Sequence, residues 1–260
     1  MKDPDRNATT ARAFQLSCVF GLGLLALAWL GSSARASTLA GDYFKIPFGH
    51  PDTGKGIDFT TVTGLVKSTL GPDGLPVVSA FGATYAGPSG PITDVNGSGE
   101  ILWWTAGQDG VLFEKSQIDT LPLAFPAFYP DGQTGDTPFY RSVHWTGTFS
   151  LPTSGTITIG LGSDDDAWVF IDGTLQVDNG GVHGVTFVPT VTSPLTAGGH
   201  TIDVFFADRH TTGSGIFLDA SVSFQAPTAV PEPSSTCLLL SAVVSLGTFL
   251  IRPRRRAANA

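Results

Sequence analysis

Cysteine is nearly absent from this chain of 260 residues. The two cysteines, Cys18 and Cys237, both lie in apolar segments close to the ends of the chain. The long stretch between them therefore contains no disulfide bond and no thiolate metal site. A metal site in this stretch would have to use oxygen or nitrogen ligands.

Basic residues are also scarce between Ser37 and Ala229, where 6 Lys and Arg residues stand against 19 Asp and Glu residues, a net charge of −13. Such an acidic stretch excludes nucleic-acid binding, which needs a basic face. Seventeen of the 19 acids are Asp, a poor helix former that favours turns and cation sites. Helical periodicity is missing, and the 32 Gly and 18 Pro residues of the chain indicate many short strands joined by turns.

Residues 1–36 have the layout of a secretory signal peptide. A weakly basic leader precedes an apolar run at 19–30, and the small residues Ala34 and Ala36 then offer a cleavage site for signal peptidase. An uncleaved membrane anchor is the alternative, but the apolar run is short for a membrane span. We therefore expect a signal helix that directs export and is removed after Ala36.

Residues 226–256 hold three features in order: a Pro-rich linker at 226–233, an apolar segment and a basic tail, the last two within 234–256. The basic tail predicts a transmembrane segment whose end stays in the cytoplasm. This order resembles the PEP-CTERM sorting signal of Gram-negative bacteria that produce exopolysaccharide. The resemblance implies a transient inner-membrane anchor, exosortase cleavage near Pro231-Glu232-Pro233, and release or transfer to the cell surface or extracellular matrix. An ordinary single-pass anchor is the alternative.

The middle of the chain, 37–225, is predicted to form one all-β domain, a single antiparallel β-sandwich with long loops. Short strands without a repeating unit favour a sandwich over a propeller or a solenoid. The patterns that indicate strands are alternating apolar residues at 155–161, 202–206 and 216–224, and a hairpin at 168–177 around the turn Asp172-Gly173.

The region 45–140 shows less pattern and is expected to supply the first strands and long loops of the same domain. It contains the pair Trp103-Trp104. Since neighbouring side chains of a strand point to opposite faces, we expect one of these rings to point inward and the other outward.

Asp164, Asp165 and Asp166 form the one dense cluster of residues that could carry chemistry. The cluster lies between two predicted strands and therefore at a tip of the sandwich. Adjacent carboxylates repel one another, and a cation that neutralises them is the chief reason to hold them together. Oxygen ligands without nearby Cys or clustered His select Ca²⁺ rather than Zn²⁺ or copper. A solvated acidic turn is the alternative.

The strings 163–173, 178–183 and 205–214 resemble the fibro-slime domain, with looser agreement at 64–76 and 128–132. Fibro-slime domains in turn look like the protective-antigen-type β-sandwich of yeast flocculin adhesins. The resemblance therefore implies the same fold and a sugar-binding site at the tip of the sandwich.

The resemblance to the adhesins also implies which residues of this chain would bind Ca²⁺. The resemblance implies that Asp164 and Asp165, joined by a cis peptide bond, hold Ca²⁺ together with Asp208, which follows a late apolar strand. It also implies that the backbone carbonyls of His210 and Thr212 complete the site. Asp166 stands where the family usually has Gly, a departure that would add a ligand or alter the loop.

Four side chains near the cluster are candidates for contact with a ligand. Trp168 could stack on the apolar face of a sugar, although a Trp within a strand also fits the core. His183, Arg209 and His210 lie in or beside Gly-rich loops close to the cluster, and Arg209 could instead pair with the acids.

These features favour a non-catalytic, Ca²⁺-dependent module of the cell surface or matrix that binds a polysaccharide or another glycan. A purely structural matrix protein with a stabilising Ca²⁺ is the alternative. A glycosidase is less consistent with the sequence, because hydrolysis needs two carboxylates that face each other about 5–9.5 Å apart. The chain also has no Gly-x-Ser-x-Gly elbow, His-Glu-x-x-His helix or phosphate loop.

Overall fold

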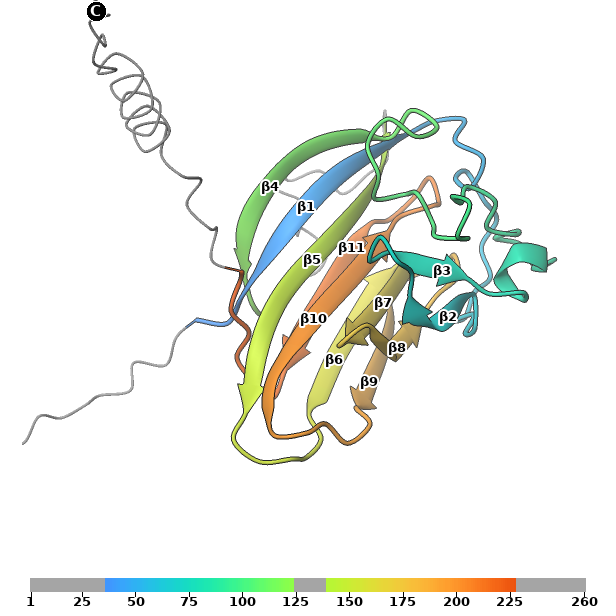
Figure 1. Cartoon of the computed structure of the whole chain (residues 1–260). Helices are drawn as coiled ribbons and strands as arrows, with labels where there is room; N and C mark the ends of the chain where they lie inside the picture. The colour runs from blue at the N-terminus through green and yellow to red at the C-terminus, as the bar shows by residue number, and fades with distance from the viewer. Residues whose placement is uncertain (1–35, 124–138, 228–260) are drawn as a thin grey trace, which may run out of the picture. The chain divides into compact units, whose positions relative to one another are not determined.

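The computed structural model describes residues 36–123 and 139–227, which fold into a sandwich of two antiparallel β-sheets (Figure 1). The prediction of an all-β sandwich is confirmed. The larger sheet has the order β3 (Pro76–Val78), β2 (Val66–Leu70), β8 (Thr174–Asn179), β7 (Asp166–Ile171), β10 (Gly198–Ala207), β5 (Phe139–Leu151), β1 (Thr38–Pro47) and β4 (Leu112–Thr120). The smaller sheet has the order β11 (Gly215–Ala220), β6 (Thr158–Asp164) and β9 (Thr186–Val191).

Two hydrophobic clusters stabilise the fold, one on each face of the larger sheet. The first lies between the sheets, where Leu161 of β6 and Leu218 of β11 pack with Trp145 and Val204 of the larger sheet. The second lies on the opposite face, where loop residues cover β7 and β10. All six residues of β7 are buried. Since β7 is buried on both faces, its sequence is continuously apolar after Asp166 instead of alternating.

The prediction for Trp103 and Trp104 is wrong, because both side chains are buried in the second cluster. These residues lie in a turn rather than in a strand, so the alternation of a strand does not apply to them. Each indole finds a polar partner: Trp103 Nε1 donates to Asp52 at 3.0 Å and Trp104 Nε1 donates to the carbonyl of Phe206 at 3.0 Å. Both rings thus pack as core residues beneath the loops.

Several predicted segments lie outside the described residues. These are the signal helix, of which only Ala36 is described, and the whole of the C-terminal segment with Pro231, Glu232, Pro233 and the predicted transmembrane helix at 234–256. Within 36–123 and 139–227, no helix is long and apolar enough to cross a membrane.

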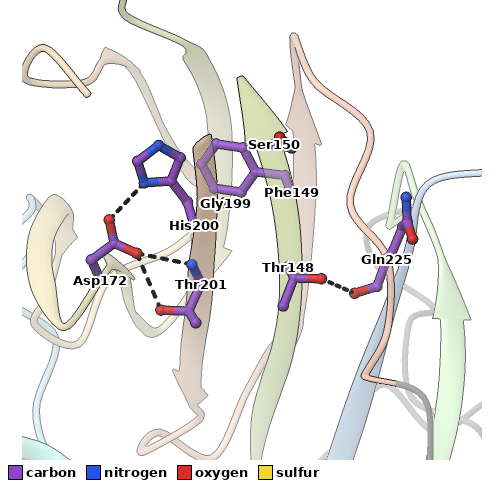
Figure 2. Close-up of a pocket in the computed structure, with 8 residues that line it drawn as sticks. All are labelled: Thr148, Phe149, Ser150, Asp172, Gly199, His200, Thr201 and Gln225. Atoms are coloured by element: carbon purple, nitrogen blue, oxygen red, sulfur yellow. Dashed lines mark hydrogen bonds and ion pairs between the residues drawn. The ribbon is translucent and has the colours of Figure 1, made fainter. Parts of the chain in front are cut away.

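The predicted hairpin at 168–177 is present as β7 and β8, and an ion pair fastens its turn to β10. Asp172 and Gly173 have positive φ values of 50° and 71°, as a two-residue hairpin turn requires. His200 Nδ1 donates to Asp172 at 2.6 Å (Figure 2). His200 Nε2 donates to the carbonyl of Thr196 at 2.9 Å. Both ring nitrogens face oxygens that only accept, so this arrangement holds an imidazolium.

The pair makes the stability of the fold depend on pH. The hydrogen bond to Asp172 raises the pKa of His200. A histidine whose pKa is raised by folding stabilises the fold fully below its unfolded pKa of about 6.5, and this contribution disappears as the pH rises through the folded pKa.

We predict that Asp172→Asn lowers the melting temperature by about 2–4 °C at pH 6, because it removes the partner of the imidazolium. As the pH is raised to 9 the imidazole of the unmodified protein loses its proton more readily than at pH 6, and the difference between the two proteins should shrink. Thermal unfolding of both proteins at the two pH values measures this. An equal difference at both values would contradict the role of the ion pair.

Candidate functional site

The acidic cluster lies where the ends of three strands meet. Asp164 ends β6, Asp166 begins β7, and Asp165 connects the two strands. Ala207, the last residue of β10, pairs with Asp166, so the chain that follows β10 starts beside the cluster. Antiparallel pairing therefore brings Asp208, the third carboxylate implied by the resemblance, close to residues more than forty positions earlier in the sequence.

The carboxylate of Asp165 is the centre of the hydrogen bonding at this tip. Its Oδ1 accepts from the backbone N–H of His183 at 3.0 Å, and its Oδ2 accepts from the N–H groups of Arg209 at 2.8 Å and His210 at 2.9 Å. The N–H of His210 also lies 3.4 Å from Oδ1 of Asp208. One side chain thus holds two loops, 180–184 and 208–213. The peptide bond between Asp164 and Asp165 is cis.

The surroundings of Asp165 disfavour its charged form. Burial raises the pKa of Asp165 well above its usual range, and the neighbouring carboxylates of Asp166 and Asp164 raise it further. The hydrogen bond from the N–H of Arg209 acts in the opposite direction without cancelling the effect of burial. A buried carboxylate of this kind is stabilised either by a proton or by a nearby cation.

Asp166 is paired with Arg209 inside the protein, and both side chains are fully buried. Arg209 Nε donates to Asp166 Oδ2 at 2.6 Å and Nη2 donates to Oδ1 at 3.1 Å, while the N–H of Gly181 donates to Oδ1 at 2.6 Å. The guanidinium also lies 5.0 Å from the ring centroid of Trp103. Burial, the largest single influence, lowers the pKa of Arg209, but the charge and hydrogen bond of Asp166 together with the charges of Asp165 and Asp52 outweigh it, and the pKa is raised.

These contacts define the observed roles of Asp166 and Arg209. Asp166 is fully buried, accepts hydrogen bonds from Arg209 and Gly181, and is not among the residues that line the cavity described below, so its observed role is to pair with Arg209. Arg209 is likewise enclosed, and its guanidinium is not available to a ligand at the surface.

A cavity of about 280 Å³ opens beside the two remaining acids. Gly213 closes one side of it with a φ of 82°, and a Cβ at this position would lie 2.5 Å from Asp164 Oδ2. A side chain at position 213 would therefore displace the carboxylate. Asp208 is fully buried and is not among the residues that line the cavity, which are Ile57, Asp164, Asp165, His183, Gly184, His210, Thr212 and Gly213.

The candidate ligand contacts differ in their access to this cavity. Trp168 is completely buried, and its Nε1 donates to Asp178 at 2.9 Å, so the proposed stacking of this ring on a sugar is wrong. His183 is also buried, and its Nδ1 donates to the carbonyl of Gly184 at 3.0 Å. His210 is half-buried, and its Nδ1 accepts from the N–H of Thr212 at 3.3 Å. The proton of a neutral His210 is then on Nε2, and the residue is one of those that line the cavity.

Sequence reasoning missed a second group of potential ligands, in which atoms of His50, Asp94 and Asp109 lie within 4.8 Å of one another. No motif links these distant positions. His50 Nδ1 accepts from the N–H of Asp52 at 3.2 Å, and Nε2 therefore carries the proton that is donated to Asp94 Oδ2 at 2.9 Å. Without a free nitrogen lone pair this group is a hydrogen-bonded support of the loops and not a metal site.

We predict that Arg209→Gln lowers the free energy of unfolding by about 3–5 kcal/mol, because it leaves the buried Asp166 without its cation. Adding Asp166→Asn to this variant should restore part of the loss, which urea unfolding of the two single variants and the double variant measures. As a control, Lys45→Gln breaks a partly exposed pair with Glu114 and should cost less than about 1 kcal/mol. A double variant as unstable as the sum of the singles would contradict the pairing.

Comparison with known proteins finds two family matches in the chain, the PA14 domain over residues 129–233 and the PEP-CTERM protein-sorting motif over residues 229–256. Similar proteins include psiE of Dictyostelium discoideum, 45% identical over 67 residues that cover 25% of this chain and 13% of psiE. Protein psiR of the same organism is 27% identical over 217 residues, covering 71% of this chain and 21% of psiR. This chain thus spans only a small part of these curated relatives.

Among solved structures, the PA14 sugar-binding domain from RTX adhesin aligns with a TM-score of 0.35 and 12% identity, covering 74% of this chain and 94% of that domain. The fibro-slime resemblance is not confirmed by these matches. The sorting motif indicates export to the envelope or surface of a Gram-negative cell. A PA14 domain and a PEP-CTERM protein-sorting motif are therefore both present in this protein.

Proposed function

We propose that this protein is a non-catalytic, Ca²⁺-dependent carbohydrate-binding module for adhesion at the cell surface or in the exopolysaccharide matrix. The observation that carries the proposal is the cavity at the tip of the sandwich, which two adjacent carboxylates, Asp164 and Asp165, line together with the loop 210–213. The PA14 match and the sorting motif support it, because together they fit an exported carbohydrate-binding protein.

The residues at the cavity fit Ca²⁺ in their chemistry. The proposed donors are all oxygens, namely the carboxylates of Asp164, Asp165 and Asp208 and the backbone carbonyls of His210 and Thr212. Of these residues, Asp164, Asp165, His210 and Thr212 line the cavity, and Asp208 Oδ1 lies 3.4 Å from the backbone nitrogen of His210. Oxygen donors of this kind suit Ca²⁺ better than Zn²⁺ or copper. A divalent cation would also stabilise the charged form of Asp165, which burial disfavours in its absence.

Sugar binding would combine the cation with the rim of the cavity. A Ca²⁺ with open coordination positions can take two neighbouring hydroxyl oxygens of a sugar in place of water. His210 Nε2 and the hydroxyl of Thr212, both at the cavity, would then orient the ring through hydrogen bonds.

The structural alternative, in which the cation only stabilises the loops, has one observation in its favour. None of the residues that line the cavity is aromatic except for the two histidines, and Trp168 is buried. A sugar would therefore find no Trp, Tyr or Phe face in the cavity itself. Glycan binding, rather than Ca²⁺ binding, separates the two functions.

We further propose that signal peptidase and an exosortase process the chain near Ala36 and Pro231-Glu232-Pro233. The sorting motif matched at 229–256 follows β11, the last strand within the described residues, which ends at Ala220. Cleavage at this motif would separate the folded domain from the apolar segment and release it from a transient inner-membrane anchor.

We predict that about 10 mM Ca²⁺ raises the melting temperature of the chelator-treated full-length protein by about 3–10 °C, for an affinity of about 10⁻⁴–10⁻³ M. Asp165→Asn should abolish the rise, because it removes a charge from the site while keeping the shape of the side chain. Asp219→Asn is the matched control, since Asp219 is exposed on β11 and outside the cavity. A rise of the same size in Asp165→Asn would refute the assignment of the site.

We predict that the protein binds at least one polysaccharide on a glycan array in Ca²⁺, and that a chelator abolishes the signal. His210→Ala should weaken this binding by about tenfold through the lost hydrogen bond, while the rise in melting temperature with Ca²⁺ remains. If Ca²⁺ stabilises the protein and no glycan is retained, the structural function is the correct one.

A further inference from the structure

The outer face of β6 carries no side chain at two successive outward positions, Gly160 and Gly162. Ile159 and Leu161 point into the core between the sheets, so the alternation of the strand places Gly160, Gly162 and Asp164 together on the opposite face. The proposed calcium ligand Asp164 thus lies on the same strand face as the two glycines.

The neighbouring strands supply walls on both sides of these glycines. Gly162 pairs with Phe217 of β11 and with Phe187 of β9. A Cβ at position 162 would lie 2.6 Å from the ring of Phe187, so this ring lies directly over the glycine. The two Phe rings meet edge to face with their centroids 5.8 Å apart, and Phe187 is 59% exposed. An aromatic pair therefore crosses the strand next to Asp164 and offers an exposed ring surface.

Beyond the aromatic pair, a cavity of about 300 Å³ lies over Gly160. Phe217 forms its aromatic side, the exposed Asp219 contributes a carboxylate, and Thr158 and Ser221 contribute hydroxyl groups. An aromatic face next to hydrogen-bonding oxygens is what a sugar ring requires, because one of its faces is apolar while its edge carries hydroxyl groups. The mixture of groups fits a neutral glycan better than a purely apolar partner.

The two cavities are aligned along one strand. Asp164 lies four positions after Gly160, which corresponds to about 13 Å along β6. We infer that a polysaccharide chain bound at the Asp164–Asp165 cavity extends over Phe187 and Phe217 into the cavity at Gly160. This inference rests on the proposed function and adds the class of ligand: an extended glycan chain and not a single sugar.

Gly160→Val tests the extension without touching the proposed calcium site. A Cβ at this position would make an ordinary contact of 3.5 Å with Phe217, and valine is favoured in strands, so the fold should be kept while the cavity is filled. Ser150→Val is the matched control, an exposed strand position on the larger sheet. The probes are mannan with mannose, galactan with galactose and dextran with glucose, titrated into the full-length protein in Ca²⁺.

For a pair that the unmodified protein binds, we expect the polymer to bind at least about tenfold more tightly than its monosaccharide. Gly160→Val should remove this difference while leaving the affinity for the monosaccharide and the rise in melting temperature with Ca²⁺ unchanged. Ser150→Val should behave like the unmodified protein.

Equal affinities for polymer and monosaccharide, or a Gly160→Val variant that keeps the difference, would overturn the extension and leave the proposed function intact. If the unmodified protein binds no probe, the proposed function fails for these glycans and the extension falls with it. A change in oligomeric state of Gly160→Val on gel filtration would also overturn the inference, because it would show that this face joins two copies of the chain.

Discussion

A single buried carboxylate fastens the loops at one tip of the sandwich. Asp165 accepts hydrogen bonds from the N–H groups of His183, Arg209 and His210, and so holds two loops that are distant in sequence. Burial disfavours the charged form of this carboxylate and raises the pKa of Asp165. The shape of the tip and its proposed affinity for a cation thus depend on the same side chain.

The larger sheet places the partners of this carboxylate. Because β7 and β10 are neighbours in antiparallel register, the start of one and the end of the other lie side by side, and Asp208 and Arg209 follow directly. The buried ion pair of Arg209 and Asp166 neutralises one acid of the cluster. Because Asp166 also accepts a hydrogen bond from Gly181, it links the loops 180–184 and 208–213 in addition to Asp165. The proposed cation ligands are then Asp164 and Asp165, which line the cavity, and the buried Asp208.

Much of the fold could be predicted from the sequence, and the predictions that failed did so for physical reasons. Ile157, Ile159 and Leu161 were predictable as inward residues, because a strand with one solvent-exposed face keeps strict alternation. The burial of both Trp103 and Trp104 could not be predicted, because it depends on the loops that cover the second face of the larger sheet. Turn residues of these loops enter the core there. Trp168 is buried for the same reason: both faces of β7 are covered.

The sequence also located the acidic cluster at a tip of the sandwich, because three adjacent carboxylates are a strong local signal. It did not separate their roles. That Asp166 pairs with Arg209 while Asp164 lines a cavity depends on contacts over more than forty residues, which no local pattern encodes. The cavity over Gly160 was missed for a related reason, since its walls come from β6 and β11, two strands that pair only in the fold.

The measurement that tests this account most directly is a calorimetric titration of Ca²⁺ into the chelator-treated full-length protein. The account predicts one ion per chain, with a dissociation constant of about 10⁻⁴–10⁻³ M and no binding to Asp165→Asn. An unmodified protein that binds no Ca²⁺ up to about 10 mM, ten times the weakest expected constant, would contradict the account.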